Sequence, residues 1–296
     1  MPGNSKIGEL IASAPKPFFS FEFFPPAQAE QMEEFYQSVD KLGKYNPLFL
    51  SVTYGAGGAK QRNTLAITSQ LAKRGFTTMA HLTCVGATRA NILEFLDELM
   101  AQEVQNILAL RGDPPVNTDW NWQSGDFRHA SDLVEFIRHE RPQMGIGVAA
   151  YPAPHPESAS FSADRYYTAL KFANGADFAI SQLFFDPREY EALVSDLKRR
   201  GVDKPVIPGI ITIQSFNGLK RVLSLCGANI PAKLYIGLEE ANARGGIEAV
   251  REAGIKFTLA QIRQLQEAGA PGFHLYTLNR SDLCSRILEE SGLVKN

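Results

Sequence analysis

Cysteine is scarce in this chain of 296 residues. Its three cysteines, Cys84, Cys226 and Cys284, form an odd set with no metal-like spacing, which argues against a disulfide framework and fits a reducing compartment. No apolar run approaches the roughly 20 residues that a membrane-spanning helix needs. Residues 1–17 also lack the long apolar core of a signal peptide. We therefore expect a cytoplasmic protein with no membrane partner.

An excess of either charge is also missing. Thirty Lys and Arg residues stand against 32 Asp and Glu, for a formal net charge of -2. Without a broad basic field, no nucleic-acid partner is expected. The chain has no G-x-S-x-G elbow, no phosphate-binding G-x-x-x-x-G-K-[ST] and no G-x-G-x-x-G after a predicted strand. Its five histidines show no His-Glu-x-x-His spacing, so no metal site is predicted.

The positive signal is a repeated alternation of strand and helix patterns. Eight short apolar runs predict strands at 18–24, 48–54, 77–84, 106–110, 145–151, 178–185, 206–211 and 272–277. Helical patterns follow them at 28–45, 63–74, 89–102, 130–140, 162–174, 187–200, 215–226 and 282–292, with an extra helix at 232–268 between the seventh and eighth strands. This order predicts the α/β class and a single (β/α)8 TIM barrel over residues 18–296, preceded by a short N-terminal arm, 1–17.

The residues at the ends of these runs are predicted to meet. In a (β/α)8 barrel the C-terminal ends of all strands converge on one mouth, where the chemistry sits. The runs end near Glu22, Thr53, His81, Asp113, Tyr151, Gln182, Pro208 and Tyr276. Aromatic and polar groups predicted around the same mouth could stack on a flat conjugated ligand, or could be packing residues of a large barrel: Tyr54, Tyr151, His155, Phe184, Phe216 and Tyr276.

Glu22 is the leading catalytic candidate. It lies between Phe21 and Phe23 inside an aromatic strand. Because burial disfavours an ionised carboxylate, such a position suits a general acid. The alternative is a structural glutamate bonded to a neighbouring strand.

Asp113 and His81 are weaker candidates on position alone. Asp113 follows an Arg-Gly turn at a strand end and could serve the site or cap local amides. Thr53 and His81 end two consecutive strands, although a lone histidine is more often a core or capping residue. Taken by themselves, the residues predict a barrel enzyme with a planar ligand.

Eight short motifs in register resemble one known family. FEFFPP, SVTYGA, HLTC, ALRGDPP, AAYPAPHPE, AISQLFFD, PGI and HLYTLNR keep the order found in the methylenetetrahydrofolate reductase family, from about Phe18 to the C-terminus. The chain is similar to the short bacterial form, which lacks the regulatory domain of eukaryotic members. The resemblance implies a flavin-dependent barrel that reduces 5,10-methylenetetrahydrofolate to 5-methyltetrahydrofolate with NADH or NADPH, by ping-pong transfer through non-covalent FAD. It also implies a homo-oligomer that binds a small-molecule folate substrate.

The resemblance carries roles onto individual residues. Glu22 matches the family's general acid, which helps to open the folate's five-membered ring to an iminium, and Asp113 matches an aspartate near flavin and pterin. The matched substrate-binding positions are Gln182, Phe216, Tyr276 and Arg280. Those matched to FAD are Thr53, His81, Leu110, Arg111, Gly112, Asp113, Ala130, Tyr151, His155, Asp164 and Lys171.

Three positions depart from the family pattern. His129 stands where a tyrosine is common, and Tyr167 and Leu170 stand where an asparagine and an arginine are frequent. A lost cation beside the pyrophosphate would weaken FAD binding by about 1–3 kcal/mol. Arg165, close by in the sequence, is a candidate replacement.

Two other functions are alternatives on the sequence alone. One is a barrel flavoenzyme of the proline-dehydrogenase type, and the other is a folate- or flavin-binding paralogue without turnover. The sequence contains no ribose-reading motif that separates NADH from NADPH, and the reaction could serve methionine supply or the recycling of one-carbon units.

Overall fold

The structure is a computed structural model that describes residues 5–54, 58–113, 119, 121 and 124–294. Nine parallel strands form one sheet, in the order β7-β6-β5-β4-β3-β2-β1-β9-β8. They are β1 (Phe18–Phe23), β2 (Leu50–Val52), β3 (Thr78–Thr83), β4 (Asn106–Leu110), β5 (Gly145–Ala150), β6 (Phe178–Ser181), β7 (Val206–Ile207), β8 (Gly209–Ile211) and β9 (Gly272–Tyr276).

The two ends of the sheet meet at Pro208. β7 pairs with β6 and β8 pairs with β9, so the chain segment that contains both strands links the two ends and confirms the predicted TIM barrel. The seventh predicted strand, 206–211, is split because proline has no N–H to give to the ladder. Its carbonyl still accepts a hydrogen bond of 2.9 Å from the His274 backbone. The predicted sixth strand, 178–185, was too long: β6 ends at Ser181.

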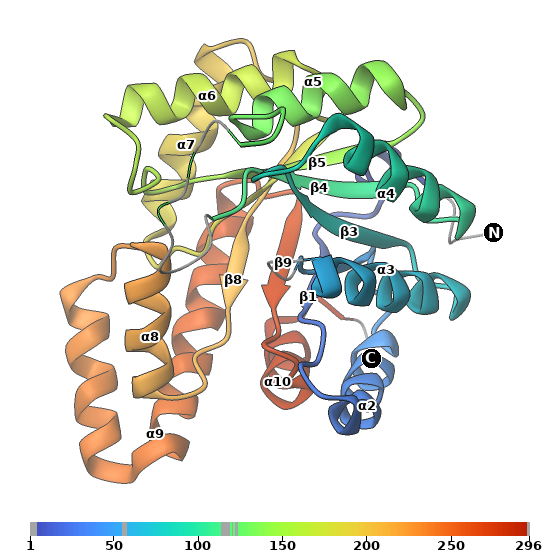
Figure 1. Cartoon of the computed structure of the whole chain (residues 1–296). Coiled ribbons are helices and arrows are strands. Elements are labelled where there is room, and N and C mark those ends of the chain that lie inside the picture. The colour runs from blue at the N-terminus through green and yellow to red at the C-terminus, as the bar shows by residue number, and fades with distance from the viewer. Residues whose placement is uncertain (1–4, 55–57, 114–118, 120, 122–123, 295–296) are drawn as a thin grey trace.

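Helices follow the strands around the outside of the ring (Figure 1). They are α2 (Met32–Gly43), after the 3-10 turn η2 (Ala29–Gln31), α3 (Gly58–Lys73), α4 (Arg89–Ala101), α5 (Ala130–Glu140), α6 (Phe161–Ala173), α7 (Pro187–Arg199), α8 (Phe216–Cys226), α9 (Ala232–Glu267) and α10 (Ser281–Ser291). Thr88 caps α4, because its side chain accepts a hydrogen bond from the Asn91 amide. None of the described helices is long and apolar enough to cross a bilayer.

The extra helix predicted between the last two strands of the ring is confirmed as α9. It is broken where Gly245 and Gly246 leave helical geometry, with Gly246 at φ 58°, a conformation that glycine adopts at little cost. α8 and the first half of α9 lie side by side and extend beyond the barrel (Figure 1).

The N-terminal segment forms a helix, α1 (Ile7–Ser13). Ile7 and Ile11 are buried against an apolar layer of side chains. The Ile7 amide donates to Asn106 Oδ1 at 2.8 Å, which fastens α1 to the start of β4. The layer that it covers consists of Phe18, Phe49, Met79, Leu108, Phe178, Ile180 and Ile207. The strand ends opposite to the predicted mouth are therefore closed by an apolar plug.

Candidate functional site

Glu22 faces the interior of the barrel, between two histidines. Its side chain belongs to β1, where Phe21 and Phe23 point to the outer core and Glu22 points inward, as the period of two requires. The residue is 7% exposed. Its Oε2 lies 3.5 Å from Nε2 of His81 on β3 and 3.6 Å from Nε2 of His274 on β9. The strand register places Ser51 and Tyr276 on either side of it.

His274 is the centre of a buried polar cluster. Its Nδ1 lies 2.7 Å from Ser20 Oγ, and its Nε2 lies 3.3 Å from Ser51 Oγ. Its ring stacks on Phe49, with centroids 5.6 Å apart and planes at 17°. In the sequence, His274 is one of five histidines without metal-like spacing. The available signal was alternation, which puts it on the same face of its strand as Tyr276.

His81 is a neutral imidazole at physiological pH. Burial lowers its pKa to about 4, against the opposing effect of the Glu22 charge. Its Nε2, the atom that faces Glu22, is buried and has no hydrogen-bond partner among the described residues. A buried polar atom without a partner is costly, so this atom is available to a ligand group.

A cavity of about 510 Å³ lies above the ends of β4 and β5. Nine of the eleven residues matched to FAD line it, while Thr53 and His81 do not. Thr53 follows β2, where its amide donates to the Phe23 carbonyl at 3.0 Å. The nine are Leu110, Arg111, Gly112, Asp113, Ala130, Tyr151, His155, Asp164 and Lys171. Residues spread over more than sixty positions therefore share one wall.

Two cations line this cavity. Lys171 is buried and donates to the Ala149 carbonyl at 2.5 Å, and burial lowers its pKa to about 8 against the pull of Asp164. Arg111 makes a two-pronged ion pair with Glu157, at 2.5 and 3.0 Å, which raises the pKa of Arg111. Cationic donors of this kind suit an anionic ligand such as a diphosphate.

The turn from Arg111 to Asp113 requires glycine at its central position. Gly112 has φ 83°, in the left-handed region. A Cβ there would lie 2.8 Å from the Thr83 Cβ and 2.9 Å from Val85 Cγ1. The Arg-Gly-Asp turn therefore packs directly on the end of β3. This packing places Arg111 and Asp113 at the cavity.

The departures from the family pattern divide into two kinds. His129 and Tyr167 both line the cavity, with ring centroids 5.9 Å apart and planes at 28°. Leu170 and Arg165 are not part of the lining. The guanidinium of Arg165 bonds to the backbone carbonyls of Tyr151 and Pro152, so the expectation that Arg165 replaces the missing cation is wrong.

The residues matched to substrate binding sit around the mouth in different environments. Tyr276 is half-buried and donates to the Ser181 carbonyl at 2.7 Å, and burial followed by the Glu22 charge raises its pKa well above 10. Gln182 directly follows β6 and accepts from the Leu183 amide. Phe216 opens α8 and is packed against Tyr235, with centroids 5.2 Å apart.

Arg280 is exposed immediately before α10, and Asp113 is exposed at the cavity. Over the described part of the chain, no group of three or more His, Cys, Asp and Glu side chains is arranged to hold a metal ion.

Comparison with known proteins identifies the family. The sequence profile of methylenetetrahydrofolate reductase matches residues 6–292. The 5,10-methylenetetrahydrofolate reductase of Escherichia coli (strain K12) is 32% identical over 278 residues, which cover 93% of this chain and 90% of the relative. Methylenetetrahydrofolate reductase (NADH) 1 of Arabidopsis thaliana is 36% identical over 288 residues, which cover 93% of this chain and 48% of that protein. The chain thus spans about half the length of its plant relatives.

A solved structure gives the same fold. An uncharacterized protein from Clostridium thermocellum that binds two copies of 5-methyl-5,6,7,8-tetrahydrofolic acid has a TM-score of 0.64 to this chain, with 13% identity and 97% and 98% of the two chains covered. At this identity the likeness concerns the fold alone. The family follows from the sequence matches: the chain belongs to the methylenetetrahydrofolate reductase family.

Proposed function

We propose that this protein reduces 5,10-methylenetetrahydrofolate to 5-methyltetrahydrofolate with NAD(P)H, through a bound FAD and a ping-pong sequence. The observation that carries the proposal is a buried carboxylate, Glu22, between two histidines, in a barrel that also holds a cation-lined cavity over β4 and β5. Family membership supports the same reaction.

The cavity fits FAD by the chemistry of its lining. Arg111 and Lys171 would hold the diphosphate, and the Asp164 carboxylate would accept from a ribose hydroxyl. Asp113, at the same wall, would orient the pterin. When bound, FAD supplies a two-electron carrier that NAD(P)H can reduce and that can in turn reduce the folate.

Glu22 supplies the acid. The substrate's one-carbon unit bridges two nitrogens of the folate, and protonation of N10 by the Glu22 carboxyl breaks the bond between that nitrogen and the carbon. The product of this step is the iminium at N5, which is ready to accept a hydride. A neutral His81 puts no positive charge beside the carboxyl, while His274, Ser20 and Ser51 form a hydrogen-bonded set behind it.

Gln182, Phe216, Tyr276 and Arg280 would position the two substrates in turn. Tyr276 is neutral and fixed by its bond to the Ser181 carbonyl, so it offers a rigid edge beside Glu22. Arg280 is exposed and can pair with the folate's carboxylate tail. A homo-oligomeric assembly and a cytoplasmic location belong to the same proposal.

The purified protein gives a direct test. Its visible spectrum is expected to show bound flavin, which bleaches on anaerobic addition of NADH or NADPH and recovers on addition of 5,10-methylenetetrahydrofolate, with 5-methyltetrahydrofolate as product. A protein that takes up no FAD contradicts the proposal. Flavin that proline reduces points to the proline-dehydrogenase type, and flavin that NAD(P)H does not bleach points to a paralogue without turnover.

A further inference from the structure

Arg165 is a buried arginine beside the proposed FAD cavity, but its side chain is not on the cavity wall. It is the fifth residue of α6 (Phe161–Ala173) and is 3% exposed. A buried guanidinium is costly unless its donors are satisfied. The groups that satisfy it therefore indicate what the arginine does.

Its partners are backbone atoms at the exit of β5. Nη1 donates to the Tyr151 carbonyl and lies 3.1 Å from Asp164 Oδ1, and Nη2 donates to the Pro152 carbonyl at 2.7 Å. The planar fork of arginine can hold two such carbonyls in one fixed geometry, which a lysine cannot do. The guanidinium carbon Cζ of Arg165 lies over the Phe161 ring, 5.8 Å from its centroid.

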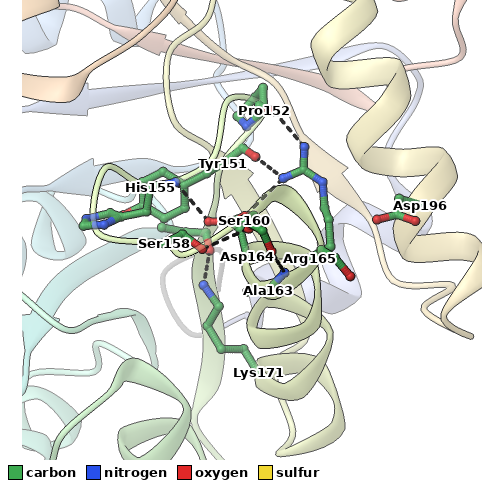
Figure 2. A network of polar contacts seen from close by, with 12 residues as sticks. Tyr151, Pro152, His155, Ser158, Ser160, Ala163, Asp164, Arg165, Lys171 and Asp196 are labelled. Carbon is green, nitrogen blue, oxygen red and sulfur yellow. Dashed lines mark hydrogen bonds and ion pairs between the residues drawn. The ribbon is translucent and has the colours of Figure 1, made fainter.

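The atoms that Arg165 holds lead directly to the cavity wall. Tyr151 and His155, at the start of the loop after β5, both line the cavity, and their rings meet edge to face at 5.1 Å. The Asp164 carboxylate connects to the same loop on its other side, because Oδ2 accepts from the His155 amide at 3.0 Å. Figure 2 shows Arg165 on the far side of Asp164 from Lys171, reaching toward Tyr151 and Pro152.

We propose that Arg165 is a positioning residue for the cofactor, which fixes the loop after β5 and the Asp164 carboxylate without touching the ligand. The inference rests on the proposed function, because it takes the cavity to be the FAD site. It assigns Arg165 a role opposite to the one expected from sequence: its charge is used inside the protein and is not presented to the diphosphate. Loss of the fork lets Tyr151, His155 and Asp164 move together, so FAD binding weakens.

The experiment compares FAD affinity in three variants of the full chain, stripped of flavin and titrated with FAD. Arg165→Met removes the fork at similar length, and Arg165→Lys keeps the charge with a single donor group. Arg200→Met is the matched control, because Arg200 also bonds to α6, through Ser162 Oγ at 3.2 Å, and touches neither the loop nor the cavity wall. Circular dichroism at the titration temperature confirms that each variant is folded, and thermal unfolding of the FAD-free form is recorded separately.

Arg165→Met is expected to raise the Kd for FAD at least about tenfold, the order of one lost charge-assisted hydrogen bond. Arg165→Lys is expected to fall between Arg165→Met and wild type, and Arg200→Met to stay within about twofold of wild type. A loss of stability alone leaves Kd unchanged while the protein is folded, so Kd separates positioning from a purely structural role.

If Arg165→Met does not fold, Arg165→Lys decides the question. Variants that bind FAD within about twofold of wild type overturn the inference, and so does an equal loss in Arg200→Met. If the wild type and Arg200→Met both fail to bind FAD, the proposed function itself is contradicted. Failure of the Arg165 inference and failure of the proposed function are therefore distinguishable.

Discussion

The two ends of the barrel interior are built from the same strands and have opposite chemistry. At the end covered by α1, inward side chains such as Phe18, Phe49 and Phe178 form an apolar plug. Two residues further along each of β1 and β2, the inward positions become Ser20 and Ser51, and Glu22 follows on β1. Burial at one end is compensated by packing, and at the other only by hydrogen bonds and ion pairs. We infer that the apolar end sets stability and the polar end sets reactivity, and the following substitutions test that division.

The largest effect on activity is expected from Glu22→Gln. The amide keeps the volume but cannot donate an acidic proton, so folate reduction should fall by about 10²–10⁴-fold, the usual contribution of a general acid. Steady-state turnover with 5,10-methylenetetrahydrofolate measures this loss, and a normal FAD content shows that the cavity is intact. Turnover at the wild-type rate would remove Glu22 from the mechanism.

The largest effect on stability is expected from Phe178→Ala in the apolar plug. Phe178 is fully buried and meets Phe49, with centroids 6.1 Å apart. The free energy of unfolding should fall by about 3–5 kcal/mol, as measured by urea unfolding of the FAD-free protein. Turnover per folded molecule should change little, and a loss as great as that of Glu22→Gln would contradict the division.

A substitution where the strands close the ring should reduce both stability and activity. In Gly209→Ala, the new Cβ would lie 2.2 Å from the Ser181 carbonyl oxygen and 2.5 Å from the Tyr276 hydroxyl. To relieve this clash, the Tyr276 hydroxyl must give up its hydrogen bond to the Ser181 carbonyl. We therefore expect overpacking to destabilise the fold by about 1–3 kcal/mol and the KM for folate to rise. Gly237→Ala, where nothing lies within 4 Å of the added Cβ, is the control for introducing the methyl group.

The smallest effect is a pH dependence of FAD affinity. Lys171 has a pKa of about 8 in the FAD-free protein, so below pH 8 it is charged and above pH 8 it becomes neutral. Affinity should therefore be full at pH 7 and weaken as pH rises through 8, with Kd rising by up to about tenfold per pH unit. Fluorescence titrations at several pH values measure this, and Lys171→Met should bind less tightly with no such change in that range.

Some of this site could be predicted from sequence and some could not. The inward direction of Glu22 follows from alternation along one strand, and the nine positions that the family resemblance matched to FAD lie along one cavity. His274 was not found, because its importance depends on the register that sets it opposite Ser20, 254 positions earlier in the chain. Arg165 was assigned wrongly because a sequence places a charge near a site without fixing which way a helix turns it.

The ends of the strands also divide into those that nearby residues determine and those that distant residues determine. The break at Pro208 is a local property of proline and could have been predicted. The early end of β6 at Ser181 could not, because the Ser181 side chain and carbonyl bond instead to Gly209 and Tyr276 across the ring. Those partners are set by closure of the barrel.

We infer that the polar end of the barrel interior protonates the folate and has no part in accepting electrons from NAD(P)H. Anaerobic stopped-flow spectroscopy of FAD-loaded Glu22→Gln measures the two half-reactions separately. We expect the flavin of this variant to be reduced by NAD(P)H at the wild-type rate and to be reoxidised hardly at all by 5,10-methylenetetrahydrofolate. Reoxidation as fast as in wild type, or a reduction step slowed as much as reoxidation, would contradict it.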